Sequence, residues 1–328
     1  MNRSFSRRQF IGTSALALAG ASLTLHAKEP AAPEQVIDIH QHLDYGGKRD
    51  PKTWDQTEAS RNNEQFIAHQ AAMGVTKTIL LPAGRLVLRD STHAGQSNGL
   101  EGTVTPNETH YKLAKEFPDK FVFGANEVSD LPEAPEVIEK YLKLGAVCIG
   151  EQKFGVECDS AEMQKLYKLA EAYNVPILMH WQHKMYNYGF ERFYKMLEKY
   201  PKVNFVGHAQ TWWANIDKDH KDQAVLYPTT KVTPGGTTDR YLSDYANMWG
   251  DMSAGSGHGA IKRDEEHYRE FMKRHQDKLM FGSDCADTIG KGAGCTGALT
   301  IASIRKLAGT KEIERKLLYG NAKKLFKL

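Results

Sequence analysis

The chain has 328 residues, of which 41% are hydrophobic and 25% are charged, a composition typical of a globular protein with a large core. Its net charge of +3 comes from the first 27 residues, which contain Arg3, Arg7 and Arg8 and no acid. Removing these three from the 43 basic residues leaves 40, against 40 acidic residues. A chain without net charge gives no indication of nucleic-acid or anionic-membrane binding, so we expect no nucleic-acid partner.

Residues 1–27 have the organisation of an export signal, with a basic start, an apolar stretch at residues 10–25 and an expected cleavage near Ala27. The stretch is too short and too weakly apolar for a membrane span, so stable membrane insertion is not expected. The segment SRRQFI, residues 6–11, resembles the twin-arginine export signal, and a general secretory signal is the alternative. Twin-arginine export carries folded proteins, so we expect this machinery as a partner, metal loading before export and a periplasmic product.

From residue 28 onward, apolar runs that predict strands alternate with amphipathic stretches that predict helices. The expected strands are Val36–His42, Val75–Pro82, Phe121–Glu127, Ala146–Lys153, Pro176–Trp181, Val203–His208, Asn247–Ser253 and Lys278–Asp284. The clear helices are Asn62–Ala72, Asn107–Phe117, Pro135–Leu144, Ser160–Tyr173, Gly189–Lys199 and Asp264–His275. Strands that are apolar throughout are typical of a parallel sheet covered on both faces.

This alternation predicts an α/β fold, a single-domain (β/α)8 or TIM barrel over residues 28–328, with its site at the C-terminal ends of the strands. An open doubly wound sheet is the alternative, but no GxGxxG follows the first strand. Two segments, 84–106 and 209–246, are too long for simple connections, and in a barrel both would lie over the catalytic face.

Polar side chains recur where the apolar strands stop. They are His40 and His42 after the first strand, Glu151 and Lys153 after the fourth, His180 after the fifth, His208 after the sixth and Asp284 after the eighth. In a strand, residues two apart share a face, so His40 and His42 are expected to project side by side. A barrel gathers these ends into one ring, where burying several imidazoles and carboxylates is costly unless they bind a shared metal.

The motifs DIHQH, MHW, GHAQ and FGSDC, together with the closing LLYGNAKKLFKL, resemble the amidohydrolase superfamily, in its branch of metal-dependent hydrolases, lactonases and decarboxylases. The likeness covers residues 36–328. It implies that His40, His42 and His180 bind metal, that Asp284 binds metal and serves as general base, and that His208 is a catalytic acid or a second-metal ligand. The implied cofactor is one or two divalent ions, with Zn2+ expected and Mn2+ as the alternative.

The fourth-strand motif IGEQKFGVECD is similar to the glutamate motif of TatD-type hydrolases, which implies that Glu151 also binds metal. Lys153 is the weaker candidate, since other members place a carboxylated lysine near this position. An ion pair between the two below the site is the alternative. Asp38, two residues before His40, is expected on the same face as a partner of the ligands.

Three residues are weaker candidates for substrate binding: Trp181 beside His180, Arg85 in the long segment after the second strand, and His258 after the seventh strand. The expected function is hydrolysis of a C–O or C–N bond in a small molecule such as a lactone, ester or amide, by a metal-activated water with Asp284 as base. Non-oxidative decarboxylation of a small carboxylic acid is the alternative, and a non-catalytic binding protein is the third possibility. A homo-oligomer remains open.

The four cysteines are Cys148, Cys158, Cys285 and Cys295. An exported protein permits disulfides. The spacings match no zinc ribbon, and Cys148 lies within an apolar strand, so buried free thiols are expected.

Overall fold

Eight parallel strands form the centre of the molecule. The computed structural model describes residues 34–43, 48–49, 56–58, 61–82 and 106–328, and the chain divides into two units, Met1–Glu34 and Gln35–Leu328. The barrel strands of the second unit are β1 (Ile37–Gln41), β4 (Lys77–Leu80), β5 (Phe121–Phe123), β6 (Ile149–Gln152), β7 (Ile177–His180), β8 (Phe205–His208), β9 (Met248–Asp251) and β10 (Leu279–Met280). The expected domain boundary near residue 27 lies outside the described residues.

These strands form a closed ring. They pair in two parallel sheets, one in the order β1-β4-β5 and the other in the order β10-β9-β8-β7-β6. A parallel bridge between Ala125 and Ile149 joins β5 to β6. On the other side, the backbone N–H of Ile39 in β1 donates to Phe281 O, just after β10, at 3.2 Å. The fold is therefore the expected (β/α)8 barrel, and the open doubly wound sheet is excluded.

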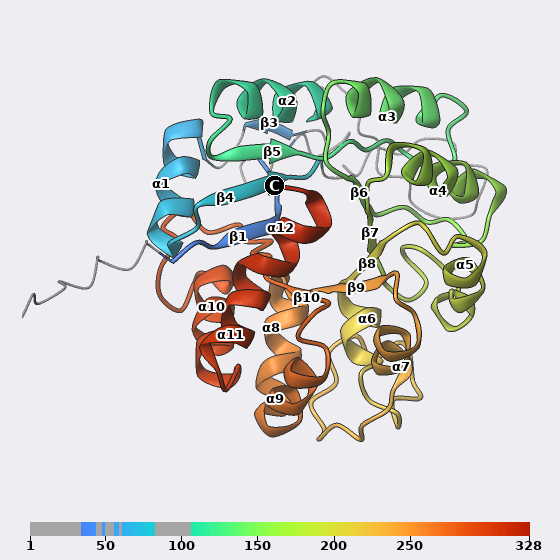
Figure 1. The fold of residues 1–328 in the computed structure, drawn as a ribbon, viewed down its shortest axis with the longest axis vertical. Helices are drawn as coiled ribbons and strands as arrows, with labels where there is room; N and C mark the ends of the chain where they lie inside the picture. Colours follow the sequence, from blue (N-terminus) through green and yellow to red (C-terminus); the bar gives the residue numbers. More distant parts are fainter. Residues whose placement is uncertain (1–33, 44–47, 50–55, 59–60, 83–105) are drawn as a thin grey trace, which may run out of the picture. The chain divides into compact units, whose positions relative to one another are not determined.

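Helices surround this ring, as Figure 1 shows for α1 on its left, α2 and α3 along its top and α4 and α5 on its right. All six expected helices are present, as α1 (Asn63–Met73), α2 (Pro106–Glu116), α3 (Ala134–Lys143), α4 (Ala161–Tyr173), the η1 (Phe190–Arg192) and α5 (Tyr194–Lys199) pair, and α9 (Glu265–Arg274). The others are α6 (Gln210–Ala214), α7 (Thr237–Asp244), α8 (Ala254–Arg263), α10 (Thr296–Leu307), α11 (Lys311–Arg315), η2 (Lys316–Gly320) and α12 (Asn321–Phe326). A short antiparallel pair, β2 (Lys48–Arg49) and β3 (Gln56–Glu58), completes the described elements.

The buried hydrophobic residues form two separate clusters, and membership of one or the other shows whether a strand side chain faces the helices or the barrel interior. The larger part packs the strands against the surrounding helices. The smaller part brings together one or two side chains from most strands with the C-terminal helix: Ile37, Ile39, Ile79, Leu81, Cys148, Leu178, Val206, Trp249, Met280, Ala322, Leu325 and Phe326. Only the barrel interior is shared by so many strands, so α12 closes one end of it. Lys327 Nζ donates to Asn174 O just before β7, which places α12 at the N-terminal ends of the strands.

Two irregularities change which side chains point inward. Between Asp38 and Gln41, β1 advances three residues while its partner β4 advances two, from Thr78 to Leu80. Between Ile149 and Gln152, β6 advances three residues while β7 advances two. One extra residue is the mark of a β-bulge, which redirects the side chains that follow it. Both bulges lie immediately beside residues that were expected to bind metal.

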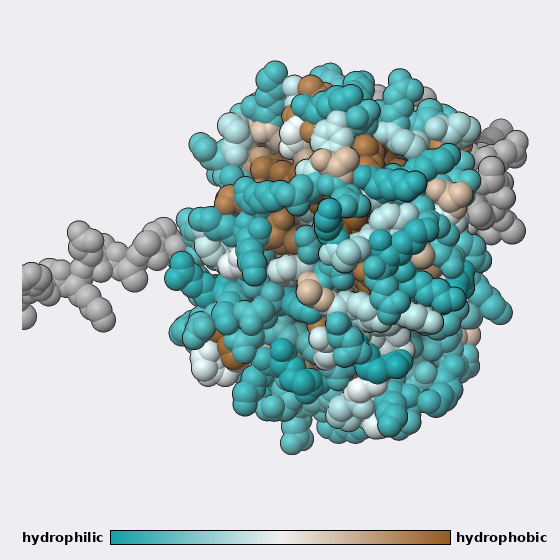
Figure 2. All heavy atoms as spheres, turned by 45° about the vertical axis from the view of Figure 1, so that its right-hand side comes forward, coloured by the Kyte–Doolittle hydropathy of each residue, from teal (hydrophilic) through white to brown (hydrophobic). Residues whose placement is uncertain are grey.

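Exposed apolar side chains are scattered over the described part of the surface. In Figure 2 the visible face is mostly hydrophilic, and hydrophobic residues show mainly between the surface elements of its upper half. Among the described residues, the exposed large hydrophobic side chains are scattered: Leu144, Met185, Tyr194, Val225, Tyr227 and Ile289. No helix within the described part of the chain is both long and apolar enough to cross a membrane.

Candidate metal centre

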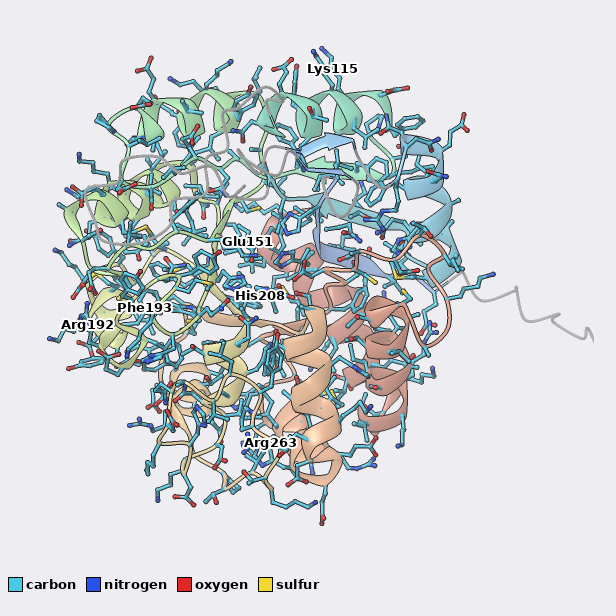
Figure 3. All side chains as sticks on the ribbon, turned by 180° about the vertical axis from the view of Figure 1, so that it is seen from behind. Lys115, Glu151, Arg192, Phe193, His208 and Arg263 are labelled. Carbon is cyan, nitrogen blue, oxygen red and sulfur yellow. The ribbon has the colours of Figure 1, made fainter. Side chains whose placement is uncertain are left out.

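Six of the residues singled out at strand ends come together at the C-terminal end of the barrel. They are His40 and His42 at the end of β1, Glu151 in β6, His180 ending β7, His208 ending β8 and Asp284 after β10. Figure 3 shows Glu151 and His208 near the middle of the view, whereas Lys115 of α2 lies at its outer edge. The side chains of the group are at most 11% exposed, and Asp284 is the most exposed of them.

Three imidazoles present their Nε2 atoms to a common space. His40 Nε2 and His42 Nε2 are 3.0 Å apart, and Asp284 Oδ1 lies 3.8 and 3.7 Å from them. His208 Nε2 is 3.5 Å from Asp284 Oδ2 and 3.6 Å from Glu151 Oε1. Ligands at bond lengths of about 2.1 Å around a tetrahedral ion are about 3.4 Å apart, so these separations fit coordination of a shared ion.

The opposite ring nitrogens of the same histidines are held by oxygen atoms. His42 Nδ1 is 2.7 Å from Leu81 O. His40 Nδ1 is 2.7 Å and His208 Nδ1 is 3.1 Å from Asp251 Oδ2, at the end of β9. Such oxygens accept an Nδ1–H bond and leave the lone pair on Nε2, which is how histidine ligands are oriented in metal sites.

Glu151 lies between His180 on one side and the His40–His42 pair on the other. Its Oε1 is 2.6 Å from His180 Nδ1, and its Oε2 is 3.3 Å from His42 Nε2 and 3.7 Å from His40 Nε2. Cys148, just before β6, faces the barrel interior and Ile149, the first residue of β6, faces the helices, so regular alternation would turn Glu151 outward. The bulge after Ile149 brings the carboxylate inward instead. Its contacts fit either a ligand shared between two ions or an acceptor that orients His180.

Backbone strain is concentrated at the same end of the barrel. Ala209 after β8, Ala254 after β9 and Asp284 after β10 have φ values of +80°, +64° and +42°. Non-glycine residues adopt this region at a cost and cluster at functional sites. The Asp284 N–H donates to His40 O at 2.8 Å, which ties the strained residue to the β1 ligand.

The electrostatics of the group are dominated by burial and by three carboxylates. Burial lowers the pKa of His180 to about 4, so this imidazole is neutral at pH 7. Burial also lowers the pKa of His208, with the neighbouring His40 adding to the effect. At His40 burial opposes protonation, but Asp284, Asp251 and Glu151 together raise the pKa above its usual value. These carboxylates therefore create a site that favours positive charge.

Two atoms of the group have no hydrogen-bond partner within the described residues, His208 Nε2 and Asp284 Oδ1. Both are buried, and both face the common space between the imidazoles. Buried polar atoms left unpaired are costly, and a cation at this position would satisfy both. The donor set, imidazole nitrogen with carboxylate oxygen, suits a divalent first-row ion. The residues therefore fit the expected metal.

Lys153, Trp181 and His258 are not among the residues whose contacts build the centre. Lys153 Nζ is 5.6 Å from the centre of the Tyr186 ring, although its charge still lowers the pKa of Glu151. Trp181 is fully buried against Phe190 and Phe193, on the helix side of β7, because it follows the inward His180 by one residue. Its position gives no support to a substrate contact.

His258 lies in α8, half-buried, where burial and Lys262 lower its pKa. The contacts within the metal centre described above do not involve it. Arg85 falls outside the described residues.

The expectation that Asp38 shares a face with His40 was wrong, although Asp38 is a hydrogen-bond partner of the His40 backbone. The bulge in β1 lies between Asp38 and Gln41, so the side chain of Asp38 does not point to the barrel-facing side that His40 occupies. Asp38 instead accepts hydrogen bonds from the backbone N–H groups of His40 and Ser283 at 3.0 and 2.8 Å, and from Ser283 Oγ at 2.5 Å. Burial raises its pKa to about 6 despite these bonds. It joins β1 to the segment after β10 from outside the centre.

Asp251 is the residue that the sequence reasoning missed. It is fully buried, and its Oδ2 also accepts from Ser253 Oγ at 2.8 Å. The available signal was its position, since it is the polar residue that ends the seventh apolar strand in NMWGD. His208 and His40 keep its pKa far below the usual range although burial opposes this.

A cavity of about 1180 Å³ lies beside the centre, over the segments that follow β7 and β8. Gln182 lines it, and Gln182 Oε1 is 3.3 Å from His180 Nε2. The expected long segment 209–246 forms much of its wall, in agreement with a position over this face. Four basic side chains line it as well: Lys184, Lys218, Lys221 and Arg240.

A parallel barrel that gathers histidines and carboxylates at the C-terminal ends of its strands defines a barrel enzyme with its chemistry at this face. Residues 37–328 match the family model described as Amidohydrolase, so the chain belongs to the amidohydrolase family. No curated protein matches the chain.

Three solved structures illustrate the likeness of fold. A probable 2-pyrone-4,6-dicarboxylic acid hydrolase from Acinetobacter baumannii, with citric acid bound, has 17% identity and a TM-score of 0.57, over 89% of this chain and 99% of that one. A 2,6-dihydroxybenzoate decarboxylase from Rhizobium has 13% identity and a TM-score of 0.55, over 90% and 99%. A 5-carboxyvanillate decarboxylase from Novosphingobium aromaticivorans, complexed with manganese, has 14% identity and a TM-score of 0.52, over 90% and 96%.

Proposed function

We propose that the protein is a metal-dependent hydrolase that cleaves a C–O or C–N bond of a small molecule, such as a lactone, ester or amide. The observation that carries the proposal is the position of Asp284. Its two oxygens face the His40–His42 pair and His208, and its side chain is more exposed than theirs. A carboxylate at the border between buried ligands and solvent suits a general base that takes a proton from water.

The proposed ion is Zn2+, with Mn2+ as the alternative, held by His40, His42, His180 and Asp284. When bound, such an ion acidifies a water molecule toward neutral pH and polarises a carbonyl group. Asp284 would accept the proton of that water and return it to the leaving group. His208, held at Nδ1 by Asp251 and Ser253, directs Nε2 toward the substrate oxygen or a second ion. If Glu151 binds metal, the centre holds two ions that share its carboxylate; if Glu151 only orients His180, the centre holds one ion.

The basic lining of the neighbouring cavity supports a substrate that carries a carboxylate. Lys184, Lys218, Lys221 and Arg240 outnumber the acids Glu191 and Asp217 among its lining residues, and Asp217 is already paired with Arg263. Arginine and lysine bind carboxylates through charge-assisted hydrogen bonds. The hydrolase among the similar structures is named for a dicarboxylic acid, and the two decarboxylases are named for carboxylic acids.

The same basic lining favours a second candidate, the non-oxidative decarboxylation of a small carboxylic acid, since that reaction needs an anchored substrate carboxylate. The two reactions differ in what enters the product. Hydrolysis in 18O-labelled water places the label in the new acid, whereas decarboxylation releases carbon dioxide without net addition of water. A panel of carboxylated lactones, esters, amides and aromatic acids, assayed for both readouts, separates them.

The role of Asp284 is tested with Asp284→Asn on any substrate found in this way. We expect kcat to fall by at least about 100-fold, the low end of general-base catalysis. Asp277→Asn is the control, because Asp277 is an exposed aspartate whose side chain pairs with Lys316 at 3.0 Å. Full turnover by Asp284→Asn, with metal retained, would overturn the assignment of the base.

We also propose that residues 1–27 direct export to the periplasm by the twin-arginine route, on the sequence features SRRQFI and the apolar stretch that follows them. A folded metal enzyme is a suitable cargo for this route, because its ion can be inserted before export. Cell fractionation tests the proposal, and retention of an Arg7→Lys, Arg8→Lys double variant in the cytoplasm is the expected result.

A further inference from the structure

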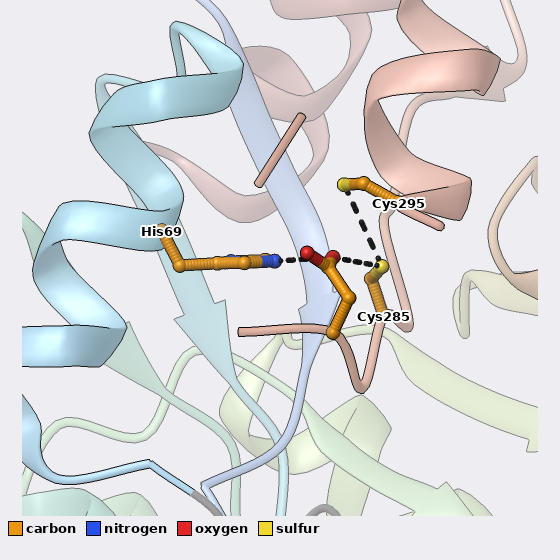
Figure 4. Close-up of side chains that lie close together, drawn as sticks. His69, Cys285 and Cys295 are labelled. Carbon is orange, nitrogen blue, oxygen red and sulfur yellow. Dashed lines mark hydrogen bonds and ion pairs between the residues drawn. The ribbon is translucent and has the colours of Figure 1, made fainter. Parts of the chain in front are cut away.

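A second group of metal-ligating side chains lies outside the centre described above. His69 comes from α1, Cys285 and Asp287 from the segment after β10, and Cys295 from the N-cap of α10. One ligand atom from each of the four lies within 4.8 Å of all the others. In Figure 4, His69, Cys285 and Cys295 surround one carboxylate, and three of the four residues are buried. Two parts of the chain that are distant in sequence, α1 and the segment from Cys285 to Cys295, thus present two sulfurs, one imidazole and one carboxylate to a single point.

The separation of the two sulfurs fits tetrahedral coordination of one ion. The sulfurs of Cys285 and Cys295 are 3.6 Å apart, and zinc–sulfur bonds of about 2.3 Å place two thiolates about 3.8 Å apart. Asp287 Oδ2 lies 2.8 Å from His69 Nε2 and 2.9 Å from Cys285 Sγ. These two contacts have hydrogen-bond length, so an ion between them requires the oxygen to move back by roughly half an ångström.

Backbone N–H groups already hold two of the four ligands, Asp287 and Cys295. Asp287 uses Oδ1 to accept the N–H groups of Ile289 and Gly290, at 2.8 and 2.7 Å, which leaves Oδ2 for the group. Cys295 Sγ accepts the N–H of Ala298 at 3.3 Å at the start of α10, a position that stabilises a negative sulfur. The segment packs directly on α1, since a Cβ at Gly290 would lie 2.3 Å from His69 O. Little rearrangement is therefore needed to bind an ion.

A buried cation stands beside the group. Arg61 is 5% exposed, and its NH1 donates to Asp287 O at 2.9 Å. Its NH2 has no hydrogen-bond partner among the residues that the structure describes, and the same is true of His69 Nδ1. A divalent ion with two thiolates and one carboxylate has a net charge of −1, which the guanidinium would balance. With two neutral thiols the Asp287 carboxylate alone gives the same net charge, so the arginine is compatible with the group both with and without an ion.

We propose that His69, Cys285, Asp287 and Cys295 form a second metal site, which binds a thiophilic divalent ion, Zn2+ by its ligand chemistry, and has a structural role. Binding replaces the two thiol protons, which are released to solvent. The site fastens α1 and α10 to the segment that begins one residue after Asp284. It is independent of the proposed reaction and would hold whether the enzyme is a hydrolase or a decarboxylase.

Cobalt distinguishes this site from the catalytic centre, whose ligands are all nitrogen and oxygen. The full chain is prepared without chelator for metal analysis, then stripped and titrated with Co2+. We expect a thiolate-to-cobalt charge-transfer band in the near ultraviolet, saturating at one ion per chain. Cys285→Ser and Cys295→Ser should each remove the band and one equivalent of zinc. His69→Gln, which keeps both thiols, should weaken Co2+ binding at the band by at least tenfold.

Cys158→Ser is the matched control, because Cys158 is a buried free cysteine elsewhere in the fold. The Cys158→Ser variant should show the same cobalt charge-transfer band as the wild type. If any cysteine variant fails to fold, the His69→Gln titration and the zinc content of the wild-type chain still decide the question. Cobalt binding without a thiolate band overturns the proposal. So does recovery of Cys285 and Cys295 as a disulfide in unreduced peptides from the purified protein.

Discussion

Replacing Asp251 by asparagine perturbs two ligands at once without changing the size of the side chain. The Oδ2 atom accepts from three groups, His40 Nδ1 at 2.7 Å, His208 Nδ1 at 3.1 Å and Ser253 Oγ at 2.8 Å. An amide carries no charge, and whichever way it turns its NH2 group faces a donor: the backbone N–H of Ser253, which Oδ1 accepts at 2.9 Å, or the Nδ1–H groups of the two imidazoles. The imidazoles therefore lose either the charge of their acceptor or the acceptor itself, and a ring without it can adopt the tautomer whose Nε2 carries the proton and cannot bind metal.

The expected loss follows from these contacts. Removing an oxygen partner of a ligating histidine lowers metal affinity by about 10–100-fold, or about 1.4–2.7 kcal/mol. Because Asp251 orients two histidines, we expect the upper end of that range. The loss of charge-assisted hydrogen bonds inside the barrel should also reduce the free energy of unfolding by about 3 kcal/mol.

The measurement is a competitive titration of the ion against a chelator of known affinity, with thermal unfolding of the metal-free proteins alongside. Asp239→Asn is the control, since Asp239 also accepts from a buried imidazole, His275 Nε2 at 2.6 Å, and pairs with Arg274. That variant should lose stability and keep its metal affinity. If Asp251→Asn keeps the affinity of the wild type, Asp251 does not orient the ligands and the reasoning fails.

The other predictions concern Glu151, His180 and the pH. Glu151→Gln should reduce the metal bound at the catalytic centre, and unchanged metal content would show that Glu151 only orients His180. The pKa of His180 is about 4 when folded and 6.5 when unfolded, so the unfolded chain takes up its proton first as the pH falls. Stability from this group is therefore present above pH 6.5 and is lost between pH 6.5 and 4, by at most about 3 kcal/mol. Metal-free wild type should lose more stability than His180→Gln between pH 7 and pH 5, and equal losses would contradict the assignment.

Much of the fold could be predicted because it depends on local pattern. All eight expected strands are present, since continuous apolar runs with helices between them can be buried on both faces only in a covered parallel sheet. Closure of the ring then brings the strand ends together. His180, His208 and Asp284 could therefore be picked out as the polar residues at which apolar runs stop.

The directions of several side chains could not be predicted, because a bulge depends on the neighbouring strand and leaves no local pattern. Alternation correctly placed His40 beside His42, but it failed between Asp38 and His40, where β1 gains a residue relative to β4. The bulge in β6 likewise turned Glu151 inward against the alternation set by Cys148 and Ile149.

The sequence by itself determined the barrel and the set of imidazoles and carboxylates at its C-terminal end, since both follow from hydrophobic periodicity and from the residues that interrupt it. The tertiary structure alone decided that Asp251 bridges His40 and His208, two residues from different strands. It also decided that Cys285 and Cys295 meet His69, more than 200 positions away in the sequence. Such contacts form only when the ring closes, and they cannot be predicted from the spacing of the residues along the chain.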